Sequence, residues 1–532
     1  TNLAMIYANR MKRSPQDVAN SLTEILRRKK IFSKVAVAGP GFINLSLDFR
    51  FVNSFVSETL EKGSAYGSTK REAPLKVILE YVSANPTGPI HVGHGRGAVI
   101  GSSLANILAF QNYDIQTEYY INDSGRQMDI LALSVIHKFN DRKNNTTSKI
   151  EGTYKGSYVD QILDEYIKKY NFDNTFKSNI QLIDSNYDDN DKLLTKLIEE
   201  SKENLGKEFD RIKNFCCSFM MSQIQTVLKK LRVNFNNFYS EKSLYHDGLV
   251  QKSIKKLESK GDTYKKDGAV WFASSKYNDE KDRVLVRADG SPTYFASDVA
   301  YHEIKFTRKN DILINIWGAD HHGYITRLKG AISSLGLDPL RLEVLLVQFA
   351  SLVMGKLKVS MSTRKGLFKT LDDLIDEVGA DATRFFYLMS KADQSLDFDI
   401  ELAKEESSKN PVYYIQYAHA RLCSVIRQSG LENVSGPVSD QADIYDESER
   451  SLIFQIGNFP EVIKSAETNR DPSIVAQYLR EFANLVHHNY VINKILVGDA
   501  EVRIARLQLA NASKHVLANG LKLLGISSPE QM

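Results

Sequence analysis

Residues 75–108 read LKVILEYVSANPTGPIHVGHGRGAVIGSSLANIL. The stretch opens with an apolar run at 77–79 that is typical of a buried parallel strand. Its middle contains Pro86 and Pro89, and proline can neither donate to a sheet ladder nor sit inside a helix. Apolar residues then recur at helical spacing to the end of the stretch. The sequence therefore predicts a strand, a tight loop and a helix in immediate succession.

This arrangement favours a phosphate-binding site, because free N–H groups and the helix dipole both face the mouth of such a loop. His91 and His94 lie at that mouth and could donate hydrogen bonds to a nucleotide triphosphate. Two other interpretations remain open. Gly93 to Ala98 fits the dinucleotide pattern G-x-G-x-x-A, with Glu118 spaced to hold a ribose. The two histidines could also be a metal pair, although no further ligands follow at the usual spacing.

The bulk properties are those of an ordinary globular chain. The 532 residues, 42% hydrophobic and 25% charged, predict several domains. There is no apolar run of membrane-spanning length and no secretory signal, and three cysteines give neither a disulfide framework nor a zinc pattern. We therefore expect a cytoplasmic protein. A net charge of +4 means that nucleic acid would have to bind local basic patches.

Strand and helix patterns alternate after residue 75, which predicts a doubly wound α/β domain. The strand-like segments after the first are 116–121, 283–287, 312–317 and 342–349. Residues of about 139–240 are rich in Lys, Asp, Asn and Tyr and look like an insertion. Before this domain, a helix is expected at 16–28 and a hairpin around Gly39-Pro40-Gly41. After it, long amphipathic helices such as 411–428 and 473–488 indicate a separate helical domain.

Several motifs resemble those of a known family. ANPTGPIHVGH at 84–94, here named the first-signature segment, resembles the HIGH signature of class I aminoacyl-tRNA synthetases. VSMSTRKG at 359–366, the second-signature segment, resembles a degenerate KMSKS signature. Further segments resemble the arginyl-tRNA synthetases, in the expected order along almost the whole chain. They are YINDSG at 120–125, GSPTYFASD at 290–298, WGADHHGY at 317–324, YAHAR at 417–421 and LGISSPEQM at 524–532.

The resemblance implies an α/β fold, with a Rossmann-type parallel sheet that carries insertions. A small α+β N-terminal domain and an all-α anticodon-binding bundle would flank it. The implied domains are 1–72 for the N-terminal tRNA-recognition (added) domain, 73–350 for the catalytic domain, 351–408 for the second-signature loop and connection, and 409–532 for the anticodon-binding domain. Relatives usually carry some tens of residues before the equivalent of Thr1, so the first domain is expected to be truncated.

The implied activity is ligation of arginine to tRNA(Arg). ATP, accompanied by Mg²⁺, would activate L-arginine to arginyl-adenylate with release of pyrophosphate, and the arginyl group would pass to the terminal ribose of the tRNA, leaving AMP. In-line attack on a phosphate depends on positioning and charge stabilisation. By resemblance, the ATP-binding residues are Pro86, Gly88, His91, Gly93, His94, Gly95, Met361 and Ser362, with His91 and His94 catalytic and Gly93 and Gly95 admitting the nucleotide to the backbone.

A guanidinium substrate requires carboxylates in a planar, bidentate arrangement. The resemblance assigns this pocket to residues at the ends of predicted strands and on one predicted helix, where Tyr294 and Asp298 would share a face. The full set is Glu80, Ser83, Asn85, Tyr294, Asp298, Asp320, His321 and His322. Taken alone, Asp298 could equally be a surface charge, Tyr294 a core aromatic and one of the histidines structural. No protein zinc site is expected.

The second-signature segment departs from the family pattern, because Ser360 and Thr363 stand where KMSKS has lysines. In some arginyl enzymes a lysine just before the first signature compensates, but here that position lies in Thr87-Gly88-Pro89. Lys356, Lys358, Arg364 or Lys365 could supply the charge for pyrophosphate. We hypothesise that Arg364 or Lys365 does so.

The tRNA contacts are also carried over by resemblance. Tyr414, Tyr417 and Arg421 lie about a turn apart on one predicted helix, and exposed aromatics can stack on unpaired bases. The terminal Met532 would reach the anticodon by analogy, and Phe42 and Asn44 would recognise the tRNA elbow. The expected partners are tRNA(Arg) and L-arginine, with no membrane, and the expected state is a monomer.

Three alternatives stay open. One is a nicotinamide-dependent oxidoreductase that uses Gly93, Gly95 and Glu118. Another is a tRNA-binding paralogue without catalysis. The third is a cysteinyl, glutamyl or glutaminyl synthetase, which shares the first signature. The carboxylates expected in the pocket and the absence of zinc cysteines favour arginine over these three amino acids.

Overall fold

The computed structural model describes residues 1–147, 150–170, 190–355, 357–358, 370–431, 438–439 and 444–532. The chain divides into two compact units, Lys70–Lys404 and Thr1–Thr69 together with Glu405–Met532. Across the described ranges, no helix combines the length and the apolar character that a membrane span requires.

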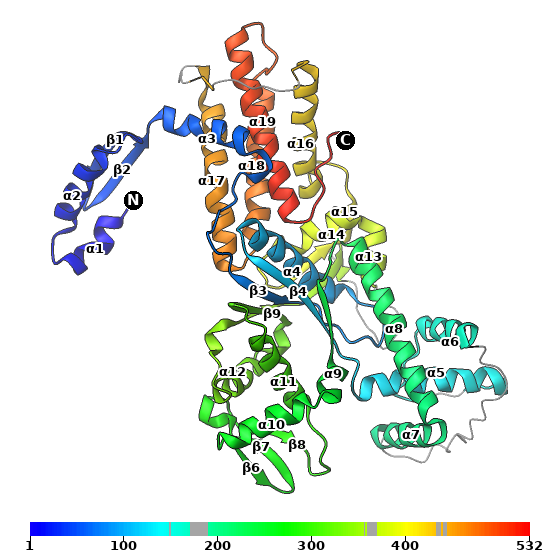
Figure 1. The fold of residues 1–532 in the computed structure, drawn as a ribbon. Coiled ribbons are helices and arrows are strands. Elements are labelled where there is room, and N and C mark those ends of the chain that lie inside the picture. Colours follow the sequence, from blue (N-terminus) through cyan, green and yellow to red (C-terminus); the bar gives the residue numbers. More distant parts are fainter. Residues whose placement is uncertain (148–149, 171–189, 356, 359–369, 432–437, 440–443) are drawn as a thin grey trace. The chain divides into compact units, whose positions relative to one another are not determined.

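A five-stranded parallel sheet forms the centre of the Lys70–Lys404 unit (Figure 1). Its order is β10-β9-β3-β4-β5. The strands are β3 (Lys76–Glu80), β4 (Asp114–Ile121), β5 (Asn237–Ser240), β9 (Ile312–Gly318) and β10 (Leu342–Val347). The chain winds from β3 outwards to β5 and then returns to the other side of β3 with β9 and β10. The predicted doubly wound fold is confirmed.

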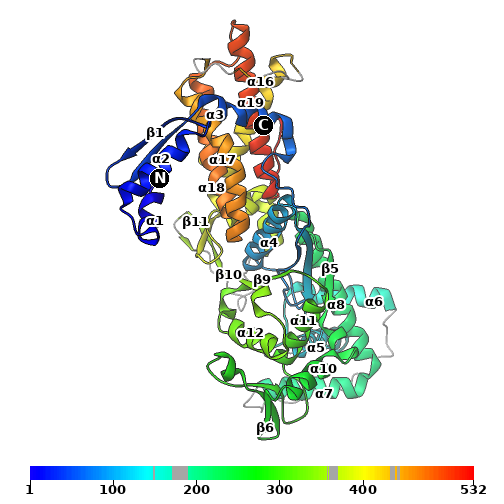
Figure 2. The same ribbon diagram turned by 60° about the vertical axis from the view of Figure 1, so that its left-hand side comes forward.

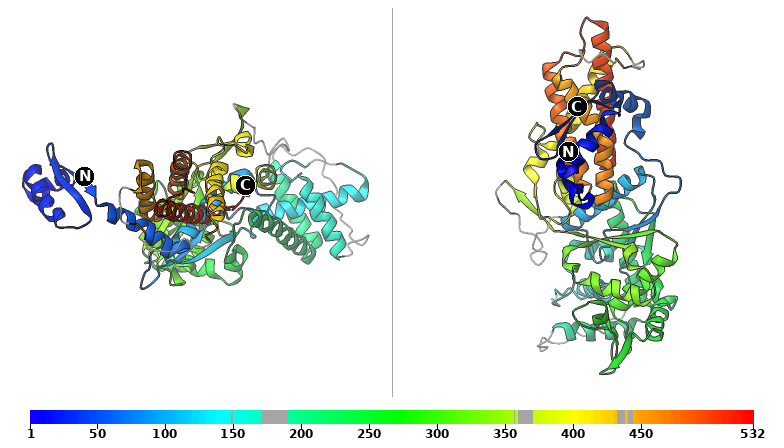
Figure 3. Two further views of the ribbon diagram at one scale, coloured as in Figure 1. Left: turned by 90° about the horizontal axis from the view of Figure 1, so that it is seen from above. Right: turned by 90° about the vertical axis from the view of Figure 1, so that its left-hand side faces the viewer.

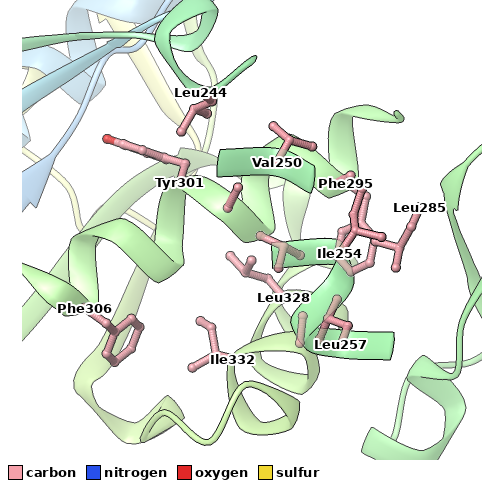
Figure 4. Close-up of a cluster of buried hydrophobic side chains, with 14 of the residues drawn as sticks. Leu244, Val250, Ile254, Leu257, Leu285, Phe295, Tyr301, Phe306, Leu328 and Ile332 are labelled. Carbon is pink, nitrogen blue, oxygen red and sulfur yellow. The ribbon is translucent and has the colours of Figure 1, made fainter. Parts of the chain in front are cut away.

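Helices bury both faces of this sheet. On one face, α10 (Leu249–Ser259), α11 (Tyr294–Thr307) and α12 (Tyr324–Ser334) enclose the hydrophobic cluster of Figure 4, which includes Ile78 of β3. The neighbours of Ile78 along β3 point to the other face by strand alternation and are equally buried. The helix α4 (Val92–Phe110) packs against β3, β4 and β9. Burial on both faces explains the uninterrupted apolar run of β3.

The expected insertion is a group of helices with its own core, drawn in cyan and green at the right of the left-hand view of Figure 3. The helices are α5 (Arg126–Asn144), α6 (Ser157–Tyr170), α7 (Asn190–Leu205) and α8 (Lys207–Lys230). The expected range of 139–240 needs a correction at its end. Asn237–Ser240 is β5, which pairs in parallel with β4. A four-residue strand is too short for sequence periodicity to separate it from an insertion.

Two small sheets complete this unit. The predicted strand at 283–287 exists as β8 (Arg283–Val286), but it is not part of the parallel sheet. It pairs antiparallel with β7 (Ala269–Phe272), which pairs in turn with β6 (Thr263–Lys266). The second sheet has the order β12-β11-β13. Its strands are β11 (Ala350–Met354), β12 (Leu357–Lys358) and β13 (Leu396–Asp399), and the neighbouring helices are α13 (Leu371–Val378), α14 (Ala380–Tyr387) and α15 (Ile400–Lys404).

The other unit contains the predicted helical bundle. Its long helices are α16 (Pro411–Gln428), α17 (Glu447–Asn469), α18 (Ser473–Ile492) and α19 (Ala500–Leu523), and α17 and α18 run side by side in Figures 1 and 2. Asn410 caps α16 and is followed by proline at the first helical position. Asp446 and Glu449 form a capping box at the start of α17. Local signals thus define the beginnings of these helices.

The N-terminal residues form a small α+β module. It contains α1 (Leu3–Met11), α2 (Pro15–Arg27) and the predicted hairpin of β1 (Phe32–Ala38) and β2 (Phe42–Leu47). Gly39 and Gly41 have φ of 53° and 129° in the turn, a conformation that favours glycine. The helix α3 (Phe49–Lys62) follows and packs against α17 and α19.

Candidate active site

A cleft of about 640 Å³ opens at the carboxyl ends of the parallel strands. It lies where the strand order reverses, between β3 and β9, which is the usual place for a ligand in an open α/β sheet. Residues that follow β3, β4, β9 and β10 contribute to its lining, together with the first turns of α4 and α11. The strand-loop-helix of the first-signature segment is therefore one wall of this cleft.

The floor of the cleft contains a constrained turn directly after β3. Val82 and Ser83 have φ of 70° and 40°, and a left-handed conformation is unusual for a β-branched residue. The Ser83 hydroxyl donates to Glu80 Oε1 at 3.1 Å and accepts from the Tyr120 N–H at 3.1 Å. The Asn122 amide donates to the Ser83 carbonyl at 3.1 Å. Neighbouring side chains thus hold the turn that leads into the first-signature segment.

His91 and His94 cap the N-terminus of α4. The Gly93 N–H donates to Nδ1 of His91 at 3.1 Å, and the His91 N–H points to Nδ1 of His94 at 3.4 Å. Burial lowers the pKa of His91, and burial with repulsion from His91 lowers the pKa of His94 to about 3. Both rings are therefore neutral at pH 7. Because Nδ1 accepts in each ring, the proton resides on Nε2, and Nε2–H is left to serve a ligand.

These caps argue against the metal-pair interpretation, since Nδ1 of each ring is already engaged. Within the described ranges, no group of three or more His, Cys, Asp or Glu residues could hold a metal ion. The dinucleotide interpretation also fails. Glu118 is buried inside the sheet, where it accepts from the Tyr301 hydroxyl at 2.7 Å and forms an ion pair with Arg308. It does not line the cleft.

Not every glycine of the first-signature region faces the cleft. Gly93 does, but Gly95 packs against protein, because a Cβ there would meet Leu371 Cδ1 at 2.6 Å and the Tyr387 hydroxyl at 2.9 Å. The expectation that Gly95 admits a nucleotide is thus corrected: its small size serves helix packing. Pro86 is buried and a Cβ at Gly88 would meet the Tyr158 hydroxyl at 3.2 Å; neither residue lines the described cleft.

Three carboxyl groups surround one end of the cleft. Glu80 forms a buried ion pair with Lys305, so its charge is balanced within the protein. Glu241, the first residue of α9 (Glu241–His246), accepts from the Ser297 hydroxyl at 3.1 Å through Oε1. Its buried Oε2 has no hydrogen-bond partner among the residues that the structure describes. Asp298 accepts from the Tyr324 hydroxyl. In the described part of the chain, neither Glu241 nor Asp298 forms an ion pair.

The two unbalanced carboxyls have raised pKa values. Burial, with a further contribution from Asp298, raises the pKa of Glu241 to about 7. Burial also raises the pKa of Asp298 to about 7, with Glu80 adding to the effect. A carboxyl group is stabilised in its charged form by a nearby cation. This end of the cleft therefore suits a cationic ligand that can pair with two carboxylates.

Other predicted pocket residues surround the same space. Tyr294 lies one turn before Asp298 on α11, as the spacing predicts, and its side chain is exposed in the cleft. Asp320 and His321 follow β9 and also line the cleft. His322 follows the short turn Ala319–His321 after β9, is exposed and lies outside the described lining. Ser83 and Asn85 complete the predicted group.

Three sequence profiles match the chain in succession. The profile described as "Arginyl tRNA synthetase N terminal domain" matches residues 1–47, "tRNA synthetases class I (R), catalytic domain" matches 55–399, and "DALR anticodon binding domain" matches 415–532. The arginine–tRNA ligases of Nitrosospira multiformis and Legionella pneumophila are 44% and 43% identical, each over 100% of this chain and 92% of their own length.

The chain belongs to the arginyl-tRNA synthetase family. A Campylobacter jejuni structure assigned to these synthetases has a TM-score of 0.78 at 32% identity, and covers 91% of this chain and 100% of its own. The Thermus thermophilus arginyl-tRNA synthetase has the same fold, with a TM-score of 0.76 at 21% identity over 99% of this chain and 93% of its own. The function of the family is aminoacylation of tRNA(Arg), and ATP use follows from its class I catalytic domain. The resemblance seen in the sequence is confirmed.

The second-signature segment of this synthetase lies outside the described residues, and with it Met361, Ser362, Arg364 and Lys365. The first described residues after it contact the first-signature segment. Thr370 forms a β-bridge with His91, and the Leu371 N–H donates to the Ile90 carbonyl at 3.0 Å.

The predicted tRNA residues occupy the unit formed by residues 1–69 and 405–532. Tyr414 and Tyr417 share one face of α16, where both rings contact His487 of α18. Arg421 donates to the Tyr417 hydroxyl at 3.1 Å and its guanidinium lies over that ring. The other three, Phe42, Asn44 and Met532, are exposed.

Sequence reasoning missed several residues that line the synthetase cleft. Glu241, Tyr324 and His302 were not singled out. Glu241 follows the strand-like run Asn237–Ser240, so a polar residue at a strand end was the only available signal. Tyr324 is the last residue of the motif at 317–324 and His302 lies on α11 beyond the motif at 290–298, and the orientation of both depends on how their helices pack.

Proposed function

We propose that this arginine–tRNA ligase activates L-arginine with ATP in the cleft and passes the arginyl group to the 3′-terminal ribose of tRNA(Arg). Pyrophosphate and AMP are the products of the two steps. The observation that carries this assignment is the pair Glu241 and Asp298, two carboxyls in one cleft that form no ion pair with any described residue. A guanidinium supplies that cation and can donate to both.

The arginine subsite follows from this pair. Glu241 and Asp298 would bind the guanidinium, with Tyr294 beside them. Ser83, Asn85, Asp320 and His321 line the remaining space and would bind the other polar groups of arginine. Glu80 would act through its contacts with Ser83 and Lys305. His322, which lies outside the described lining, has no part in this proposal.

ATP would bind across the N-terminus of α4. The Nε2–H groups of His91 and His94 can donate to phosphate oxygens as negative charge moves towards pyrophosphate, and Gly93 leaves space beside them. Mg²⁺ would enter as the MgATP substrate, held by phosphates and water. Met361, Ser362, Arg364 and Lys365 would approach from the second-signature segment, with Arg364 or Lys365 neutralising the leaving pyrophosphate.

Arginine binding should depend on pH through the two unbalanced carboxyls. Below their pKa values of about 7 both become protonated and neutral, whereas the guanidinium keeps its charge. The Kd for arginine should therefore rise as pH falls through 7, by up to about tenfold per pH unit for each carboxylate. Titration calorimetry from pH 5.5 to 8.5 measures this slope. A Kd that is constant across this range would contradict the prediction.

The aromatic face of α16 is the proposed anticodon contact. Met532 is proposed by analogy to reach the anticodon, and Phe42 and Asn44 are proposed to contact the tRNA elbow. Tyr417→Ala should remove one stacking platform, worth about 1–3 kcal/mol, and raise the KM for tRNA by roughly 5- to 150-fold. Charging assays at saturating arginine and ATP measure this change. Tyr264→Ala, at an equally exposed tyrosine of β6, is the control. Equal KM values for both variants would exclude stacking by Tyr417.

We further propose the domain limits 1–72, 73–350, 351–408 and 409–532, with the insertion ending before β5.

The three cysteines are free thiols, as is usual in the reducing cytoplasm, where we propose that the reaction takes place. We propose that the enzyme acts as a monomer, which light scattering after gel filtration would test.

Arginine-dependent ATP–pyrophosphate exchange tests the proposed function directly. The assay is run with and without tRNA, and lysine and citrulline serve as controls for charge and shape. Exchange should occur with arginine but with neither control, and the family resemblance leads us to expect it only when tRNA is present. Absence of exchange under every condition would favour a tRNA-binding protein without catalysis.

A further inference from the structure

Arg96 is a fully buried arginine whose described hydrogen bonds all go to backbone carbonyls. It lies on α4, two residues after His94, and its side chain has no exposed surface. One guanidinium nitrogen donates to the carbonyls of Gln348 at 2.9 Å and Gln394 at 2.6 Å. The other donates to Lys391 at 2.7 Å and Ser390 at 3.4 Å.

Burial of a charge without an ion pair is unfavourable, and an apolar side chain would fill this space at lower cost. Burial accordingly lowers the pKa of Arg96. The advantage of a guanidinium is its rigid planar shape. Its N–H donors point in fixed directions, like a fork, and can hold several acceptors in one arrangement. Arg96 is thus suited to hold backbone segments in a defined position relative to α4.

Arg96 binds two backbone segments. One leads along the chain to the second-signature segment, and the other leads to β13. Gln348 follows β10, lines the cleft and is separated from β11 by a single residue, Phe349. The other acceptors belong to the connection between α14 and β13, and β13 pairs in parallel with β11. The Gln348 N–H also donates to the Ala392 carbonyl at 2.8 Å, which ties the two segments together. From this root the chain continues through β11 and β12 into residues 359–366.

We propose that Arg96 is a positioning residue that couples the histidine pair of α4 to the root of the second-signature segment. The inference rests on the proposed function, in which the triphosphate binds between these two parts. The binding of arginine to Glu241 and Asp298 does not involve this coupling. Loss of the fork should therefore affect the activation step and spare arginine binding.

Arg384 provides a matched control. It is equally buried and also bonds to α4, where it donates to the hydroxyls of Ser102 at 2.9 Å and Ser103 at 3.1 Å. Its third described bond goes to the Leu231 carbonyl at 2.8 Å. Arg384→Gln removes a buried guanidinium of α14 that bonds to α4, without removing the bonds to the root of β11.

The experiment compares Arg96→Gln, Arg96→Lys and Arg384→Gln in the full chain. We expect both glutamine variants to lower the Tm, but only Arg96→Gln to lower the kcat of pyrophosphate exchange, by about 10- to 100-fold, since small misplacements have effects of this size. The calorimetric Kd for arginine should stay within about twofold of the wild-type value for each variant. Arg96→Lys keeps the charge without the fork and should also lose kcat.

An unchanged kcat in the Arg96 variants would overturn the proposal, as would an equal loss in Arg384→Gln, which would point to stability alone. If Arg96→Gln does not fold, the kcat of Arg96→Lys decides in the same way. Failure of the proposed function is distinguishable, because the wild-type enzyme itself would then show no arginine-dependent exchange.

Discussion

Glu241→Gln is expected to lower kcat/KM for arginine by at least about 100-fold. The substitution keeps the shape of the side chain but removes one of the two unbalanced carboxylates, so the substrate guanidinium would be buried with half of its counter-charge. Removing one partner of a buried ion pair costs about 3–5 kcal/mol, and each 1.4 kcal/mol corresponds to a factor of ten. Arginine-dependent pyrophosphate exchange at pH 8 measures the loss.

The same substitution should not destabilise the free enzyme. The pKa of Glu241 is raised by burial to about 7, so the folded state prefers the protonated form. The penalty of ionisation grows as pH rises from the ordinary carboxyl pKa and is complete above about 7. Glutamine avoids this penalty, and the Tm at pH 8 should therefore stay equal or rise.

Glu303→Gln is the control for Glu241→Gln. Glu303 is a buried glutamate on α11 that pairs with Lys256 and accepts from the Ser253 hydroxyl at 2.6 Å, outside the cleft lining. Its replacement should leave kcat/KM for arginine within a few-fold of wild type. A loss of less than about threefold in Glu241→Gln would show that Glu241 does not bind the guanidinium.

His91→Asn should separate helix capping from catalysis. Asparagine is a favourable N-cap and can place an oxygen near the position of Nδ1, so α4 should keep its start and the Tm should change little. The Nε2–H donor is lost. Removal of one donor to a developing negative charge costs about 10²- to 10³-fold in kcat. Single-turnover formation of adenylate measures this step.

His91→Gln is the complementary variant. Its amide can reach the position of Nε2 but not that of Nδ1, so it should retain more activity than asparagine and lose more stability. If both variants lose kcat in proportion to Tm, His91 serves only as a cap. Calorimetric binding of a non-hydrolysable ATP analogue would show whether the loss lies in nucleotide affinity or in the chemical step.

Local signals in the sequence were sufficient for much of the fold. The apolar run of β3, the prolines of the loop and the glycines of the β1–β2 turn act within a few residues, so they predict structure without knowledge of partners. The predicted helix 411–428 agrees with α16 at both ends. Its start is defined locally, by the cap Asn410 and by Pro411. In contrast, β5 and β8 are each only four residues long, and their partners depend on contacts that the local pattern does not encode.

The predicted site residues also separate into those that local geometry could place and those that it could not. Tyr294 and Asp298 could be placed on one helical face because helix geometry alone relates residues four apart. Gly95 could not be assigned correctly, because whether it faces a ligand or Tyr387 depends on the packing of α4 against α13 and α14.

By itself, the sequence determined the family and the succession of its domains, because the motifs of each domain are contiguous in the sequence. Only the tertiary structure decided which carboxyls of the cleft form an ion pair within the described protein and which do not. Lys305 balances Glu80 from 225 residues away, and Glu241 reaches the cleft from beyond an entire insertion. Charge balance inside a protein is a property of distances and burial in space, and separation along the chain does not specify either.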